Sequence, residues 1–312
     1  MNRRPLGATG IEVSEIGLGA WQLGNTDVWI GPDREASLRM VGEALDFGVN
    51  LFDTAPAYAG GNSELILGEA LQGRRDQAVL VTKFGHTVDG GSNWDAGRIE
   101  PAIEQSLKNL RTDYLDVILM HNPASDLLDG RTAPHYVEFE RLKAAGVIRA
   151  YGASVDWATE VDTVVETTGS QVVEVLLNAF HQEPRPALAR AALSGVGAIV
   201  KVPLDSGWLA GRYGKDASFT DVRSRWSQAD IGRRADLVER LRELLPDGVS
   251  MAHAALRFLL AHSCVSSVLP GAKSSEQLRA NVDAAAAPLP TETVAAIEDL
   301  WSKEIQGSPL PW

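Results

Sequence analysis

Cysteine, basic charge and long apolar runs are all scarce in this chain. Its 312 residues include one cysteine, Cys264, which excludes an internal disulfide and fits a reducing cytoplasm. Acidic side chains outnumber basic ones by 41 to 29, and the net charge of −12 disfavours nucleic acid and anionic membranes as partners. No apolar run reaches the roughly 18 residues of a membrane span, and the amino terminus lacks the apolar core of a signal peptide. We therefore expect a cytoplasmic protein.

The sequence alternates short apolar runs with longer amphipathic stretches. The runs cover residues 15–20, 49–55, 78–83, 114–121, 147–154, 172–179, 197–203 and 265–272. Most of them begin about 25 to 40 residues apart, the length of a strand, a helix and two loops. They are continuous rather than alternating in apolar character, which is typical of parallel strands buried on both faces. Eight such units predict an α/β fold, a (β/α)₈ barrel, in a single domain of residues 1–312.

A doubly wound open sheet is the alternative fold. It is expected to carry G-x-G-x-x-G after its first strand, whereas this chain has GLGAWQLG, with Gln22 in place of the third glycine. Two segments lie outside the repeat. Residues 3–13 predict a hairpin with its turn at 7–10, and residues 204–234 predict a long loop after the seventh strand. The terminal SPLPW either folds back over the barrel mouth or forms a disordered tail.

Polar side chains end three consecutive apolar runs. The second run ends in Asp53, the third in Lys83 and the fourth in His121, and Tyr58 lies in the loop after Asp53. Each residue alone has an ordinary structural explanation, as a turn residue, a surface lysine, a hydrogen-bonded histidine or a packing tyrosine. Together they fall on the carboxyl-terminal rim of the predicted barrel, where barrel enzymes carry their catalytic groups.

These four side chains predict proton transfer to a carbonyl oxygen. The reference pKa of tyrosine is near 10, and an ammonium such as Lys83 favours the phenolate. Asp53 is expected to hold that lysine, so that the pair lowers the pKa of Tyr58, the candidate general acid. His121 is expected to donate a hydrogen bond to the same oxygen. The chemistry needs no metal and no nucleophile, but it needs a hydride donor in the form of a bound cofactor.

The motifs around these residues resemble those of the aldo-keto reductases, over essentially the whole chain. The matching segments are DTAPAYAGGNSELILGEAL, VTKFG, SLKNLRTDYLDVILMH, SGWLAGRY and VLPGAKSSEQLRANVDAA. The resemblance implies an NAD(P)(H)-dependent oxidoreductase without a Rossmann domain, with Asp53, Tyr58, Lys83 and His121 as its tetrad. The expected activity is NADPH-dependent reduction of aldehyde, ketone or sugar carbonyls. Two alternatives stay open: a sugar or alcohol dehydrogenase working oxidatively, and a cofactor-binding sensor or scaffold subunit without turnover.

Cofactor-binding residues are predicted at the last strand and the helix after it. Lys273 and Ser274 precede that helix, whose free N–H groups suit a phosphate, and Gln277 and Asn281 share the helix face of Lys273. The resemblance assigns this segment to the adenosine 2′-phosphate and adenine, which favours NADPH over NADH. The predicted cofactor set is completed by Trp21, Ser154, Glu174, Asn178, Lys201, Ser206, Gly207, Leu209, Gly211, Arg212 and Gly271.

Three residues depart from the family's pattern around the nicotinamide. Val155 stands where the family usually has asparagine, Glu174 where it has glutamine, and Lys201 where it often has an aromatic ring. These changes affect the expected hold on the nicotinamide and leave the tetrad complete. An aromatic-walled pocket for a small-molecule carbonyl substrate is predicted from Trp21, Trp94 and Trp226. The expected assembly is a monomer or a small homo-oligomer.

Overall fold

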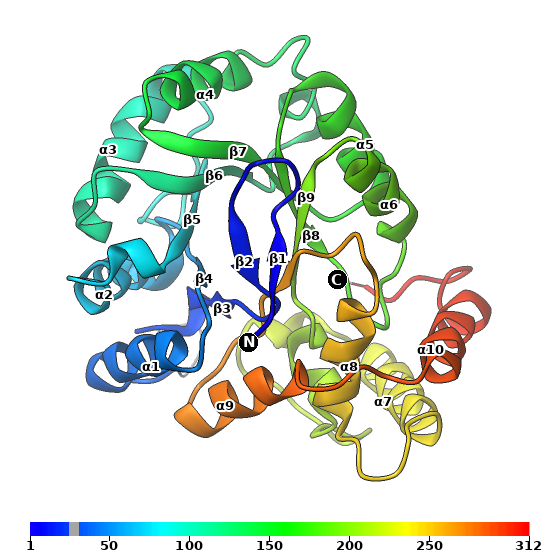
Figure 1. The fold of residues 1–312 in the computed structure, drawn as a ribbon. Helices are drawn as coiled ribbons and strands as arrows, with labels where there is room; N and C mark the ends of the chain where they lie inside the picture. The colour runs from blue at the N-terminus through cyan, green and yellow to red at the C-terminus, as the bar shows by residue number, and fades with distance from the viewer. Residues whose placement is uncertain (25–30, 312) are drawn as a thin grey trace.

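A computed structural model describes residues 1–24 and 31–311 of the chain (Figure 1). Its centre is a parallel sheet with the strands in chain order: β3 (Leu18–Gly19), β4 (Leu51–Asp53), β5 (Val79–Phe84), β6 (Leu115–His121), β7 (Ile148–Val155), β8 (Val172–Leu176), β9 (Gly197–Lys201) and β10 (Ser267–Val268). The two edges meet, because Ile16 forms a parallel bridge with Val268 and the Gly17 N–H donates to the Val268 carbonyl at 2.9 Å. The sheet therefore closes, and the predicted (β/α)₈ barrel is confirmed.

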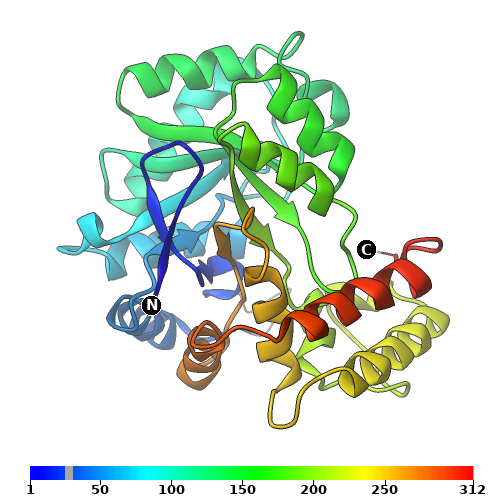
Figure 2. The same cartoon turned by 45° about the vertical axis from the view of Figure 1, so that its right-hand side comes forward.

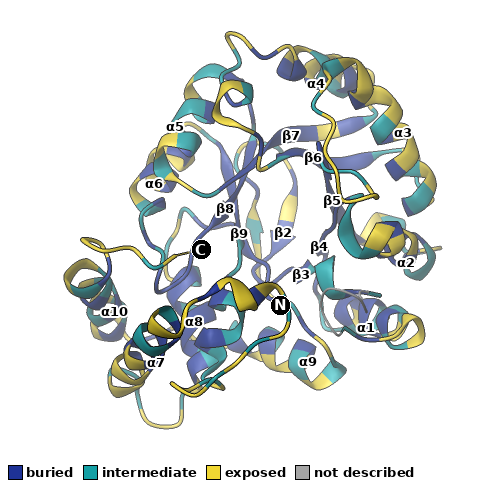
Figure 3. Ribbon diagram, turned by 180° about the vertical axis from the view of Figure 1, so that it is seen from behind, coloured by how far each residue is buried: buried dark blue, intermediate teal, exposed yellow. Residues whose placement is uncertain are grey.

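Helices surround the buried strands, and the exposed residues lie mainly on the outward sides of the helices and in the loops (Figure 3). The helices are α1 (Arg34–Asp46), α2 (Asn62–Ala70), α3 (Ile99–Leu110), α4 (His135–Ala144), α5 (Ala158–Thr167), α6 (Arg185–Leu193), α7 (Gln228–Glu243), α8 (Met251–Leu260), α9 (Ser275–Ala284) and α10 (Thr291–Glu304). Contacts between α1 and α9 complete the ring on the side where the sheet closes. Helices α7 and α10 lie beside each other at one side of the barrel (Figure 2), joined by an ion pair between Arg240 and Glu304.

The predicted hairpin is confirmed and covers the amino-terminal end of the barrel (Figure 1). It consists of the antiparallel strands β1 (Arg3–Pro5) and β2 (Glu12–Ser14). Its apolar side chains Leu6, Ile11 and Val13 are buried with the residues that fill the barrel interior. Gly7 turns with a φ of 58°, and a Cβ there would lie 2.3 Å from the Gly195 carbonyl oxygen, so the turn has room for glycine alone. Apolar packing thus closes this end.

The long segment after β9 is less irregular than predicted. Short 3₁₀ helices occupy Asp205–Ala210 and Val222–Arg225, and α7 begins at Gln228, so the prediction of a loop to residue 234 is wrong. The reason is a capping box, in which the Ser227 hydroxyl and the Asp230 carboxylate each bond the other's backbone N–H.

The carboxyl-terminal segment lies against α7. Arg233 donates to the Ser308 carbonyl and Arg234 to the Pro311 carbonyl, each at 2.5 Å, and Leu310 packs against the core. Residues 308–311 therefore fold back, as one of the two interpretations of SPLPW expects, and they contact α7. Trp312 lies outside the described residues. In the part of the chain that the structure describes, no helix has the length and apolar character needed to cross a membrane.

Candidate active site

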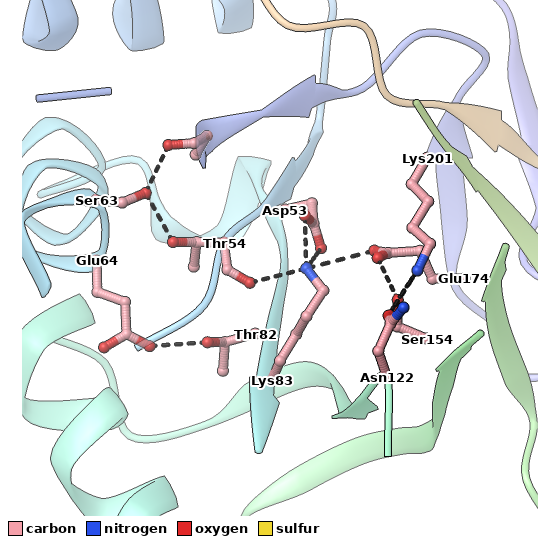
Figure 4. A network of polar contacts seen from close by, with 11 residues as sticks. Asp53, Thr54, Ser63, Glu64, Thr82, Lys83, Asn122, Ser154, Glu174 and Lys201 are labelled. Carbon is pink, nitrogen blue, oxygen red and sulfur yellow. Dashed lines mark hydrogen bonds and ion pairs between the residues drawn. The ribbon is translucent and has the colours of Figure 1, made fainter. Parts of the chain in front are cut away.

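The buried ion pair between Lys83 and Asp53 forms the centre of the site (Figure 4). Lys83 ends the apolar run of β5 and Asp53 ends β4, so both side chains enter the barrel mouth. The Lys83 Nζ lies 2.7 and 2.6 Å from the two Asp53 carboxylate oxygens and donates to the Thr54 carbonyl at 3.1 Å. Burial alone lowers the pKa of Lys83, but Asp53 and Glu174 raise it above its ordinary value, so the lysine is an ammonium.

Tyr58 stands beside this lysine. The Lys83 Nζ lies 5.1 Å from the centre of the Tyr58 ring. The backbone turns sharply after Tyr58, because Ala59, Gly60 and Gly61 all have positive φ. This turn separates the tyrosine from α2 and leaves it at the rim of the mouth.

The predicted direction of the Tyr58 pKa is wrong in this structure. Burial raises the pKa of Tyr58 well above its ordinary value, because the phenolate loses its solvation. Lys83 acts in the predicted direction and favours the phenolate, whereas the Asp53 and Glu174 carboxylates oppose it. Tyr58 is therefore a protonated phenol in this structure, and it holds its proton more tightly than predicted.

His121 completes the predicted tetrad from the end of β6. Its ring meets the Tyr58 ring edge-on, with the centroids 5.6 Å apart. Burial, together with the charge of Lys83, holds the pKa of His121 well below its usual range, so the imidazole is neutral. Its Nδ1 is buried and has no hydrogen-bond partner. The structure thus brings together all four predicted catalytic side chains.

One wall of the mouth continues from His121 as a row of rings. His86 meets His121 edge-on at 4.8 Å, and Trp94 meets His86 at 5.6 Å. Gly85 has a φ of 121° and leaves no space for a Cβ beside Trp94, which fixes the indole here. This placement supports Trp94 as a pocket residue. His86 was not among the predicted site residues, although it lies only three residues after Lys83.

The departures Glu174 and Lys201 belong to the same polar network as Lys83 and Asp53 (Figure 4). Glu174 Oε1 accepts from the Ser154 hydroxyl at 2.8 Å, and Glu174 Oε2 lies 3.5 Å from the Lys83 Nζ. The Lys201 ammonium donates to the Ser154 Oγ at 2.8 Å and forms an ion pair with Asp156 at 2.9 Å. Charged groups therefore cross the mouth from β4 to β9.

Asn122 and Asp156 were overlooked by the sequence analysis. Asn122 Oδ1 accepts from Lys201 at 2.6 Å, and its Nδ2 donates to Asp156 Oδ2 at 3.1 Å. Asn122 directly follows β6, and Asp156 directly follows β7. This position after a strand end is the sequence signal from which both could have been predicted as residues of the mouth. The Ser154 hydroxyl also donates to Asn122 Oδ1 at 3.1 Å. Asn122 therefore places a side-chain amide next to Ser154, close to Val155, where the family's usual asparagine is missing.

The predicted phosphate segment lies at the start of α9. The Ser274 hydroxyl caps this helix by accepting from the Gln277 N–H. Loss of solvation and the nearby Arg223 charge lower the pKa of Lys273, whereas the Asp221 carboxylate, which pairs with Arg223, acts in the opposite direction. Gln277 accepts from the Lys273 N–H at 2.9 Å, and Asn281 donates to the Gly271 carbonyl at 3.2 Å.

The other predicted cofactor residues are divided between loop backbone and core. Ser206, Gly207 and Gly211 have positive φ in the turn after β9, whereas Leu209 is fully buried. Asn178 is also buried, where it donates to the Val202 carbonyl and accepts from the Phe180 N–H. Arg212 is exposed, and Trp21 lies partly buried in the turn after β3.

Trp226 does not line an open pocket as predicted. It is 5% exposed and packs against Trp208 and Phe219, with the Arg234 guanidinium 4.3 Å from the centre of its ring. The long loop therefore has its own aromatic core, which a sequence position alone does not reveal. Over the described ranges 1–24 and 31–311, no three His, Cys, Asp or Glu side chains group together as metal ligands.

Comparison with known proteins identifies the family. The model of the aldo/keto reductase family matches residues 15–302, and the chain belongs to this family. The oxidoreductase YqkF of Bacillus subtilis, described as uncharacterized, is 30% identical over 98% of both chains. The NADH-specific methylglyoxal reductase of Escherichia coli is 31% identical over 91% of this chain and 93% of its own.

A solved structure agrees with this assignment. The holo form of aldo-keto reductase AKR11C1 from Bacillus halodurans is 30% identical, covers 96% of both chains and superposes with a TM-score of 0.82. The protein is thus an NAD(P)H-dependent oxidoreductase of the aldo/keto reductase family.

Proposed function

We propose that the protein reduces aldehyde or ketone carbonyls, including those of sugars, with NADPH. The observation that carries this proposal is the position of the Tyr58 phenol, whose ring centre lies 5.1 Å from the Lys83 Nζ and 5.6 Å from the centre of the His121 ring. A reduced nicotinamide, when bound, supplies the hydride. Tyr58 then gives its proton to the carbonyl oxygen, and His121 orients that oxygen with a hydrogen bond. Lys83 stabilises the phenolate that forms.

The preference for NADPH rests on Lys273. Its positive charge directly precedes the amino terminus of α9, where a 2′-phosphate would be favoured. The Escherichia coli relative is named for NADH, so family membership leaves this choice open. We further propose that the chain works in the cytoplasm as a monomer or small homo-oligomer, consistent with its single cysteine.

The test is turnover of a simple activated aldehyde with NADPH by the purified protein and by Tyr58→Phe. The variant keeps the ring contacts and loses the proton, so we expect kcat to fall by on the order of 10³-fold. Circular dichroism and NADPH binding, followed by tryptophan fluorescence, check that the variant is folded. Equal turnover by both proteins contradicts the assignment of Tyr58. Turnover found only with alcohols and NADP⁺ favours the oxidative dehydrogenase instead.

Cofactor choice is tested with Lys273→Ala. Fluorescence titration of the unchanged protein should give a lower Kd for NADPH than for NADH. Removal of the cation should weaken NADPH binding by about tenfold, the effect of one lost charge-assisted contact, and should leave NADH binding unchanged. Lys303→Ala, which removes an exposed cation on α10, serves as the matched control. If both nucleotides weaken equally in Lys273→Ala, Lys273 does not read the 2′-phosphate.

A further inference from the structure

Glu174 is a buried carboxylate in the barrel mouth to which the proposed reaction gives no role. Its residue is 2% exposed, and it enters from β8, which is not a neighbour of the strand that carries Lys83. Oε1 accepts from the Ser154 hydroxyl, whereas Oε2 is buried without a hydrogen-bond partner and lies 3.5 Å from the Lys83 Nζ. Such an oxygen is costly to bury unless a charge compensates it, and Lys83 is that charge.

Two carboxylates therefore meet one ammonium. Asp53 and Glu174 both lie within 3.5 Å of the Lys83 Nζ, and all three side chains are buried. Tyr58 faces the lysine as a neutral phenol. The cluster thus holds one more negative charge than its own positive charge. One bound proton removes this excess.

The surrounding groups do not supply the missing charge directly. From β9, the Lys201 ammonium reaches Glu174 only through the Ser154 hydroxyl, and its direct ion pair is with Asp156. From β6, His121 is neutral. The proton therefore has to reside on one of the two carboxyl groups.

The directions of the carboxyl pKa values agree with this count. Burial and then the Glu174 charge raise the pKa of Asp53 well above its usual range. Burial alone would raise the pKa of Glu174 as well, but Lys83 and Lys201 lower it. Burial and the repulsion between the two carboxyl groups thus favour one bound proton in the pair, whereas Lys83 favours one ionised carboxylate.

We propose that Asp53 and Glu174 form a carboxyl pair that shares one proton beside Lys83, so that the pair carries a single negative charge next to Tyr58. The kinetic part of this inference rests on the proposed function; the shared proton does not. Neutralising Glu174 should let Asp53 ionise, so that the cluster keeps one negative charge in total.

Infrared difference spectroscopy of the protein without cofactor tests the shared proton. At neutral pH the unchanged protein should show the C=O band of a protonated carboxyl group, and Glu174→Gln should lose it. Glu64→Gln is the matched control, because Glu64 is fully buried and bonded to Thr82 and Asn109, away from Lys83. Asp205 is also buried but pairs with Arg234, and any band that it contributes should survive in both variants.

Isotope labelling makes the test independent of variant folding. Carbon-13 in the carboxyl groups of aspartate and of glutamate, introduced in separate samples, should shift the band of the unchanged protein with one label or with both. Absence of the band at neutral pH, or its persistence in folded Glu174→Gln, overturns the shared proton. A band that shifts with neither label does not come from the pair and overturns the shared proton as well.

The single charge of the pair is also tested by the pH dependence of kcat. The alkaline limb that Tyr58→Phe abolishes should stay in place in Glu174→Gln, since Asp53 then ionises and the total negative charge near Tyr58 is unchanged. Glu64→Gln should also leave this limb in place. A limb that moves to lower pH by about one unit in Glu174→Gln shows that both carboxyl groups are ionised in the unchanged protein, and it overturns the shared proton. If the unchanged protein shows no turnover, the proposed function fails while the infrared result still decides the shared proton.

Discussion

Two buried charge clusters lie at opposite ends of the barrel and are built in opposite ways. At the amino-terminal end, Asp116 is 1% exposed and accepts from Arg75 at 2.8 Å, from Arg149 at 2.6 Å and from the Leu80 N–H. At the mouth, two carboxylates share Lys83, and a Glu174 oxygen has no hydrogen-bond donor. The same strand, β6, begins near Asp116 and ends in His121.

The difference separates structural charge from charge that does chemistry. Asp116 accepts from two guanidinium groups and a backbone N–H, so both of its carboxylate oxygens have charge-assisted hydrogen bonds. The mouth cluster has more carboxylates than direct cations and contains lysine, tyrosine and histidine, whose protonation responds to their surroundings. The reactive end of the barrel is therefore the one where buried carboxylates outnumber the cations that contact them directly.

The largest effect is expected from removing the central cation at each end. Lys83→Met should lower kcat/KM for carbonyl reduction by on the order of 10³-fold, because the Tyr58 phenolate loses its stabilising charge. Arg75→Met, the counterpart at the other end, should leave kcat/KM of the folded protein unchanged. Steady-state kinetics on both variants make the comparison. Equal losses of activity would show that the two clusters are not functionally distinct.

Removing Asp116 is expected to act on stability alone. Asp116→Ala leaves Arg75 and Arg149 without their buried partner, and because the Arg149 side chain is 46% exposed the expected cost is about 1–2 kcal/mol, below that of a fully buried pair. Urea denaturation measures this loss of unfolding free energy. The position of the pH limb that depends on Tyr58 should stay where it is. A shift of this limb would mean that removing the Asp116 charge changes the pKa of Tyr58 at the other end of the barrel.

A smaller effect is expected from His262, near the amino-terminal end. Burial and the Arg185 charge lower the pKa of His262 to about 4. Because the unfolded chain binds this proton near pH 6.5 and the folded chain does not, stability is full above that pH and declines as the pH falls toward 4. His262→Gln should reduce the decline by about 1 kcal/mol, a figure discounted for partial exposure. Denaturation at pH 7 and pH 4.5 measures it, and identical declines contradict the shifted pKa.

The barrel and the tetrad were predictable because both follow from position along the chain. Buried parallel strands are continuous apolar runs, and a polar residue that ends such a run must lie at the same rim as the others. Asp53, Lys83 and His121 were found in this way. The start of α7 was missed because the capping box at Ser227 lies inside a polar stretch that read as loop.

Contacts across the barrel could not be predicted in the same way. Glu174 and Lys83 come from strands that are not neighbours, so no local spacing reveals that their side chains meet. The pKa of Tyr58 depends on burial, which outweighs the charge of Lys83. Trp226 follows a strand like Trp94 does, but its loop folds on itself and buries the ring.

The seam that closes the sheet joins the beginning of the chain to a segment more than 250 residues later. Arg4 donates to the carbonyls of Leu260 and Val265, and the Val268 N–H donates to the Glu15 carbonyl. During synthesis the edge of β3 therefore stays unpaired until β10, the last strand of the barrel, has left the ribosome. Contacts this distant in sequence slow folding. A shortened or tagged amino terminus would act first on the yield of folded protein, before any property of the mouth changed.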